Sequence, residues 1–163
     1  MSDARKLLIL GGIALAAWGM LYGLYYAIFI EHQILNEIGS SLASTFAHAA
    51  EGERKAAENA LLVFREARYK YVRQVDVHSH WIGLAMLMIL LGLAFDGSSR
   101  HRRAQSWIAW AMLAGSLIFP LGVILQTANQ GKLVGSILAV GGAGLVIFAL
   151  AAAAWRFAPK KTA

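Results

Sequence analysis

The chain has 163 residues, of which 58% are hydrophobic and 15% are charged. Soluble domains usually carry about 45–50% apolar and about 25% charged residues, so this composition indicates an integral membrane protein. The chain contains no cysteine. Disulfides, thiolate catalysis and cysteine-ligated zinc or iron–sulfur centres are therefore excluded.

Four stretches are long and apolar enough to cross a bilayer. A membrane-spanning helix needs about 20 mostly apolar residues, because each residue rises about 1.5 Å across a hydrocarbon core of about 30 Å. We expect spans at residues 7–30, 77–95, 106–127 and 133–155. None alternates as a barrel strand does, so these segments are predicted to be helices. The predicted fold class is all-α, an integral membrane four-helix bundle in which residues 1–163 form a single membrane domain.

The positive charge lies on one side of the predicted membrane. The N-terminus, residues 96–103 and the tail after Trp155 carry eight basic and two acidic residues, whereas residues 31–76 together with Lys132 carry seven of each. The positive-inside rule therefore places both termini in the cytoplasm. We expect a multi-pass protein of a bacterial-type inner membrane, with anionic lipid as the partner of the basic edges. Nucleic acid is not expected, because no aromatic residues interleave with the basic ones.

Residues 31–76 are predicted to form a helical hairpin outside the membrane, between the first and second spans. Gly52 marks the turn, and apolar residues recur at helical spacing on both sides of it. The two stripes are Ile30, Ile34, Ile38, Leu42 and Phe46, followed by Leu61, Phe64, Ala67 or Arg68, Tyr71 and Val75. Because nothing in the sequence breaks the chain at Ile30 or Val75, we favour a hairpin that stands upright. A pair of amphipathic helices lying flat in the interface is the alternative.

Histidines gather at the predicted outer ends of the first two spans. His32 follows the first span, and Asp76, His78 and His80 begin the second. Residues two apart on a helix point about 200° apart, so His78 and His80 could not share an ion there. In an extended segment, Asp76, His78 and His80 would share one face and could ligate one metal. No breaker is present, so a helix is favoured, with His80 as the histidine that faces the bundle.

Three interpretations of this outer rim are open. Haem b could be ligated by His78 or His80, with His32 as a possible opposite ligand, because a membrane helix can hold haem through an imidazole. Copper or zinc could bind among His32, His78, His80 and Asp76. The histidines could also simply bond backbone carbonyls or lipid headgroups. For haem, room for a flat macrocycle would come from glycines of the second and third spans, which are Gly83, Gly92, Gly115 and Gly122.

No catalytic residue is predicted. The chain contains no Glu-x-x-His, no Gly-x-Ser-x-Gly and no Gly-x-x-x-x-Gly-Lys, which argues against a di-iron site, a serine hydrolase and a phosphate-binding loop. We therefore do not expect catalytic activity from the chain on its own. The remaining histidines, His48 and His101, are interpreted as exposed surface residues.

One segment resembles a known family. Val77-His78-Ser79-His80-Trp81-Ile82-Gly83, continuing to Leu91-Gly92, resembles the histidine-led helix of small membrane proteins that are distantly similar to haem–copper oxidase and nitric oxide reductase catalytic subunits. Ser116-Leu117-Ile118-Phe119-Pro120-Leu121-Gly122 is similar to a proline–glycine helix in such proteins. The resemblance implies that a histidine near the start of the second span ligates low-spin haem. The predicted third and fourth spans contain no histidine, so reduction of oxygen or nitric oxide by this chain alone is not expected.

The leading functional hypothesis is a haem-b-binding redox or accessory subunit of a larger respiratory-type complex. The alternatives are a non-enzymatic structural or assembly subunit, and a copper- or zinc-binding membrane protein that uses the same outer-rim histidines. The expected partners are the lipid bilayer and either other membrane subunits or further copies of the chain.

Overall fold

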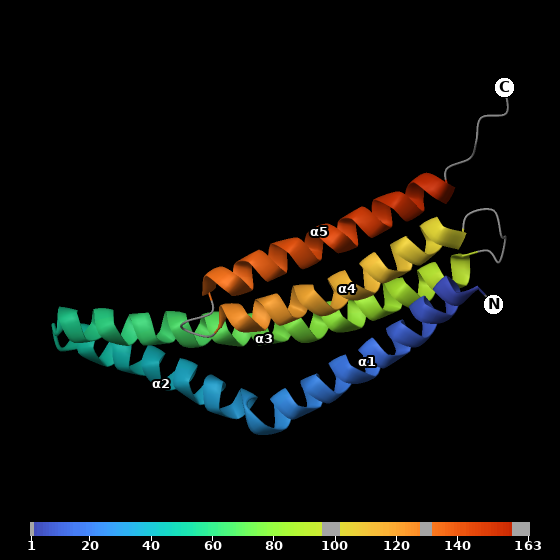
Figure 1. Cartoon of the computed structure of the whole chain (residues 1–163). Coiled ribbons are helices and arrows are strands. Elements are labelled where there is room, and N and C mark those ends of the chain that lie inside the picture. The colour runs from blue at the N-terminus through green and yellow to red at the C-terminus, as the bar shows by residue number, and fades with distance from the viewer. Residues whose placement is uncertain (1, 96–101, 128–131, 158–163) are drawn as a thin grey trace. The chain divides into compact units, whose positions relative to one another are not determined.

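A computed structural model describes residues 2–95, 102–127 and 132–157, which form five helices and no strand (Figure 1). The helices are α1 (Asp3–Phe29), α2 (Glu31–Ala50), α3 (Arg54–Ala94), α4 (Arg102–Gln126) and α5 (Lys132–Phe157). The all-α prediction is therefore confirmed for the described residues. The chain divides into two compact units. We call Met1–Met20 together with Ser79–Ala163 the first unit, and Leu21–His78 the second unit.

Four helices are long and apolar enough to cross a membrane. They are Asp3–Phe29, Arg54–Ala94, Arg102–Gln126 and the Leu133–Arg156 part of α5. Each covers one of the four predicted spans to within one residue, so the chain fits a multi-pass membrane protein. The largest difference from the predicted bounds is in α3, which begins 23 residues before the span expected at residue 77. The predicted hairpin arm and the predicted span therefore belong to one helix.

Within the first unit, α4 and α5 pack backbone against backbone. A Cβ atom added at Gly115 would lie 2.8 Å from the carbonyl oxygen of Gly142, and one added at Gly122 would lie 2.8 Å from the carbonyl oxygen of Gly135. The two pairs follow opposite orders along the two helices, so α4 and α5 are antiparallel. Small residues let membrane helices approach closely, and dispersion contacts between them replace the hydrophobic effect that lipid does not supply.

Helices α1 and α3 meet in the first unit through aromatic and small side chains. Trp18 packs edge-on against Trp81, with ring centroids 6.3 Å apart. A Cβ atom added at Gly12 would lie 2.8 Å from the carbonyl oxygen of Ala85. Large apolar side chains remain exposed on the outside of the unit, including Leu133 at 75%. Such exposure is expected of helices whose solvent is lipid, because lipid tails are as apolar as the side chains.

In the second unit, α2 and the first part of α3 run side by side in opposite directions (Figure 1). The face of α3 that packs against α2 consists of Leu61, Phe64, Ala67 and Tyr71, all buried or half-buried. The sequence left open whether Ala67 or Arg68 belongs to the apolar stripe. Ala67 is 1% exposed whereas Arg68 is exposed, so the stripe passes through Ala67. Exposed charged residues of α3 form i,i+4 ion pairs, as at Arg54–Glu58 and Glu66–Lys70. The predicted stripe is thus buried or half-buried from Leu61 to Tyr71, whereas Val75 is 41% exposed.

The predicted stripe on α2 is wrong at its end. Phe46 is 68% exposed, and the packed face continues from Ile38 through Ser41 and Thr45. The reason is geometric: each i+4 step rotates about 40° too far, so four such steps from Ile30 displace Phe46 by about 160°. The buried face follows the helical period by changing to an i+3 step after Ile38.

The helix is interrupted at Ile30, contrary to the sequence prediction that one helix continues through this residue. Ile30 has φ −119° and ψ −41°, and it separates α1 from α2. Its carbonyl oxygen accepts hydrogen bonds from the amides of both Gln33 and Ile34, at 3.1 and 3.3 Å. Because the local backbone groups stay paired, this interruption needs no glycine or proline and leaves no sequence signal. At Val75, by contrast, α3 continues without a break, as predicted.

Candidate functional site

The predicted rim residues Asp76, His78 and His80 all lie on the unbroken helix α3. The extended arrangement, in which the three side chains would share one face, is therefore not adopted. His78 and His80 point about 200° apart around the helix axis. On the helix, therefore, the three side chains do not share one face.

His78 is half-buried against α1 in the second unit. A Cβ atom added at Gly23 would lie 2.5 Å from both Nδ1 and Cε1 of His78. The imidazole thus occupies the space that the missing side chain of Gly23 leaves. One helical turn earlier, the hydroxyl of Tyr22 donates a hydrogen bond to Oε1 of Gln74. This side of the His78 ring has no room for a macrocycle.

His80 lies in the first unit and is exposed. Its ring is edge-on to the ring of Phe119 of α4, with centroids 4.7 Å apart. The ring of His80 thus faces α4, as expected of a histidine directed at the bundle, although the side chain is exposed. His78 is the more buried of the two, because its ring packs where Gly23 of α1 has no side chain.

His32 lies on α2 and is exposed. Across the described residues, one group of three His, Asp or Glu side chains brings its ligand atoms within 4.8 Å of one another, and that group does not include His32, Asp76 or His78. The three predicted metal ligands of the second unit are thus not assembled as a ligand set. His101 lies outside the described residues.

The glycines expected to make room for haem are mostly filled by protein. Gly115 and Gly122 admit the backbone of α5, and a Cβ atom added at Gly92 would lie 2.8 Å from Cγ1 of Ile9. Gly83 alone among these four has nothing within 4 Å of an added Cβ atom. Among the described residues, three cavities of about 450, 400 and 290 Å³ have linings that do not include His32, His78 or His80.

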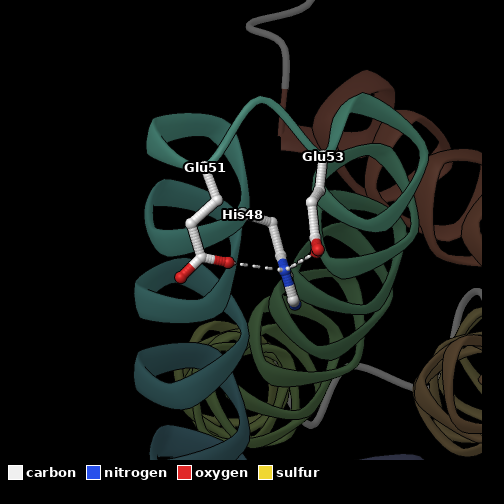
Figure 2. A group of neighbouring side chains, drawn as sticks. All are labelled: His48, Glu51 and Glu53. Atoms are coloured by element: carbon white, nitrogen blue, oxygen red, sulfur yellow. Dashed lines mark hydrogen bonds and ion pairs between the residues drawn. The ribbon is translucent and has the colours of Figure 1, made fainter.

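The assembled group of ligand-type side chains is His48, Glu51 and Glu53, at the turn between α2 and α3 (Figure 2). Nδ1 of His48 lies 2.8 Å from Oε2 of Glu53 and 4.0 Å from Oε2 of Glu51. Both carboxylates therefore approach the same nitrogen, one from the end of α2 and one from the residue before α3. All three side chains are at least one-third exposed.

The backbone of the turn explains why these three side chains meet. Gly52 has φ +77°, a conformation that favours glycine, at the position after the C-cap residue Glu51. The amide of Glu53 then donates to the carbonyl of His48 at 2.8 Å, and the amide of Gly52 donates to the carbonyl of Ala49 at 3.2 Å. This pair of bonds is the Schellman motif, which ends a helix by folding the chain back over its last turn. Glu53 is thereby held beside His48, while Glu51 lies one helical turn away on the same face.

Sequence reasoning missed this group. The sequence predicted His48 as a surface residue and Gly52 as a turn. It did not predict that this turn brings Glu51 and Glu53 to the side chain of His48. The signal was the local pattern His-x-x-Glu-Gly-Glu, residues 48–53. A glycine after a helix C-cap predicts that the next residue folds back toward the last turn. One imidazole nitrogen and two carboxylate oxygens can form a charge-assisted hydrogen bond, or bind a divalent metal ion.

Comparison of the chain with protein-family models, curated proteins and solved structures found no match in any of the three. The resemblance to haem–copper oxidase and nitric oxide reductase subunits therefore stays a prediction. Fold and local geometry are the observations on which the function must be argued.

Proposed function

We propose that this chain is a non-enzymatic accessory subunit of a larger membrane complex, and that it docks a partner protein through an outer hairpin. The outer hairpin is α2 together with residues 54–76 of α3. The observation that carries the proposal is the unbroken length of α3, 41 residues. At about 1.5 Å per residue it measures about 60 Å, twice the hydrocarbon thickness of about 30 Å.

The charge distribution along α3 indicates which half leaves the lipid. All nine charged residues of α3 fall between Arg54 and Asp76, and none follows Asp76. Charged side chains are costly inside hydrocarbon, so residues 54–76 lie outside it in this proposal. The positive-inside rule places the outer hairpin on the non-cytoplasmic face of a bacterial-type inner membrane, with both termini in the cytoplasm.

The outer hairpin exposes large apolar side chains where no lipid would cover them. On α2, Leu35 and Phe46 are 44% and 68% exposed, and on α3 Leu62 is 60% exposed. Leu35, Leu42 and Phe46 follow the i, i+7, i+11 spacing of one helical stripe, about 100° from the face packed on α3. Apolar stripes in contact with water mark protein or membrane contacts. This stripe supports docking of an apolar protein surface.

The proposal is tested by placing one charge on this stripe. Phe46→Glu adds a carboxylate at a 68% exposed position, and Ser40→Glu adds the same charge at an exposed position about 120° away around α2. The native complex is extracted from its own membranes in mild detergent and sized by native electrophoresis. We expect the wild-type chain and Ser40→Glu to migrate in a complex, and Phe46→Glu to migrate as the separate subunit. Migration of the wild-type chain alone, or unchanged migration of Phe46→Glu, would refute docking through this stripe.

Haem b is the second candidate function, and the exposed ring of His80 is the observation that favours it. With His80 exposed, Phe119 edge-on beside it and open space at Gly83 on the same helix, a haem would have to lie on the surface of the first unit. A second histidine, either His32 or one from another subunit, would be needed for a bis-histidine site. The resemblance of Val77–Gly83 to the histidine-led helix supports a histidine ligand in this segment, either His78 or His80.

An absorption spectrum of the dithionite-reduced native complex tests this candidate. We expect the α-band of haem b in the wild-type complex and its loss in His80→Ala. In His32→Ala, at an exposed position on α2, the band is lost only if His32 is the second ligand. Absence of a Soret band and an α-band from the wild-type complex would eliminate haem while leaving the docking proposal intact.

A further inference from the structure

We infer that His48, Glu51 and Glu53 bind one zinc ion at the turn between α2 and α3. Neither the docking stripe nor the rim histidines take part in this site. It would bind metal whether or not the outer hairpin docks a partner.

The ligand atoms lie close to the separations that a small tetrahedral ion requires, and all are within 4.8 Å of one another. Zinc binds histidine nitrogen and carboxylate oxygen at about 2.0–2.2 Å, which places neighbouring ligand atoms about 3.4 Å apart in a tetrahedron. Nδ1 of His48 lies 2.8 Å from Oε2 of Glu53 and 4.0 Å from Oε2 of Glu51, values on either side of that distance (Figure 2). In this inference, rotations about the two exposed glutamate side chains bring the three ligand atoms to that distance. The backbone needs no change, because the Schellman hydrogen bonds already hold it.

The charges around His48 also favour a divalent cation over a proton. A proton on Nδ1 can be donated to Glu53 at 2.8 Å, but Glu51 at 4.0 Å lies beyond hydrogen-bond distance. One of the two carboxylates is therefore not compensated by that proton. Arg54, the next residue in the chain, pairs with Glu58 at 2.9 Å. A divalent ion with a neutral imidazole and two carboxylates gives a site with no net charge.

The donor set selects zinc-like ions over the hard cations. Calcium and magnesium prefer six or more oxygen ligands, whereas one imidazole nitrogen with two carboxylates suits zinc or copper. Three protein ligands leave the fourth position to water. Because the ligands come from the end of α2 and from the residue before α3, the bound ion would join the two helices at the tip of the outer hairpin.

The test is a zinc titration of the full-length, untagged chain in detergent, in competition with a chromophoric zinc chelator. We expect one equivalent of zinc, with affinity weakened at least about tenfold in each of His48→Gln, Glu51→Gln and Glu53→Gln. The matched control is Glu37→Gln, which removes the same charge from an exposed position of α2 outside the group. Excess calcium or magnesium should not displace the zinc.

Cobalt(II) in place of zinc gives a second measurement. Visible absorption typical of tetrahedral cobalt is expected in the wild-type chain and not in Glu51→Gln. Helix content by circular dichroism should be unchanged in Glu51→Gln, because the side chain of Glu51 is 67% exposed. The absence of stoichiometric zinc binding, or full affinity in His48→Gln, would overturn the inference. Loss of zinc from His32→Gln or His78→Gln instead would move the site to the outer rim and would equally overturn it.

Discussion

Two adjacent glycines of α5 give a sharp test of the packing between α4 and α5. A Cβ atom added at Gly142 would lie 2.7 Å from Cα and 2.9 Å from Cβ of Phe119, whereas one added at Gly141 meets nothing within 4 Å. The same substitution, glycine to alanine, is therefore blocked at one position and free at the next. In Gly142→Ala the helices must separate, since the atoms in the way belong to backbone and to a Cβ atom.

The magnitude of the effect follows from the comparison of the two variants. Alanine is favoured over glycine inside a helix by about 1 kcal/mol, and this gain is common to both positions. The difference between the variants therefore isolates the cost of overpacking, which is about 1–3 kcal/mol. We expect Gly141→Ala to be as stable as the wild-type chain or more so, and Gly142→Ala to be less stable than Gly141→Ala by that amount.

Reversible unfolding in mixed micelles measures this difference. The purified chain in mild detergent is titrated with sodium dodecyl sulfate, and the free energy of unfolding is obtained from the loss of helical circular dichroism. Equal stability of Gly141→Ala and Gly142→Ala would refute the close approach of α4 and α5. The same result would mean that α5 does not fill the space at the glycines of α4, where the sequence analysis expected room for haem.

Three further substitutions test the second unit. Gly52→Ala should destabilise the turn by about 1–2 kcal/mol, because φ is +77° there. Gly39→Ala should not destabilise it, because a Cβ atom added at Gly39 meets nothing within 4 Å. Amide hydrogen exchange at the turn distinguishes the two variants. Ala67→Leu should lower the midpoint of thermal unfolding, because Ala67 is 1% exposed and overpacking costs about 1–3 kcal/mol. Leu62→Ala is the control and should change the midpoint little, because Leu62 is 60% exposed. Gly23→Ala should displace the imidazole that lies 2.5 Å from the added Cβ atom, and the histidine ring resonances in an NMR spectrum should shift; unchanged resonances would contradict the contact.

Much of the fold could be predicted from the sequence because the membrane imposes simple rules. A long uncharged apolar stretch is expected to be a helix in lipid, and each of the four predicted spans lies on a helix long and apolar enough to cross a membrane. The turn at Gly52 was found for a similar reason, since glycine is the residue that tolerates its φ. The end of the packed stripe on α2 was not found, because a run of i+4 steps drifts around the helix and Phe46 had rotated out of the contact. The interruption at Ile30 was also missed, since it leaves the local backbone hydrogen-bonded.

The candidate site was harder to predict, because side-chain encounters depend on which face a helix packs. The rotation between His78 and His80 followed from helical geometry alone, but the contact that each ring makes did not. His78 packs beside Gly23 and His80 packs beside Phe119, both on helices distant in sequence. The group at His48 could have been found, because it depends on a local backbone motif. The prediction for His48 rested on its expected exposure alone and did not use its position three residues before Glu51 at the end of the helix.

The docking proposal requires the outer hairpin to stand away from the membrane on the continuation of α3. The 23 residues from Arg54 to Asp76 are helical throughout and correspond to about 35 Å along the axis. Because the chain has no cysteine, single-cysteine variants can carry a fluorescent donor at one chosen site. Ala50→Cys places it near the turn and Ser79→Cys near the predicted outer edge of the membrane, both at exposed positions. With acceptor-labelled lipid headgroups in reconstituted vesicles, we predict strong energy transfer from residue 79 and weak transfer from residue 50. Equally strong transfer from both positions would show that the hairpin lies on the membrane surface and would contradict the account.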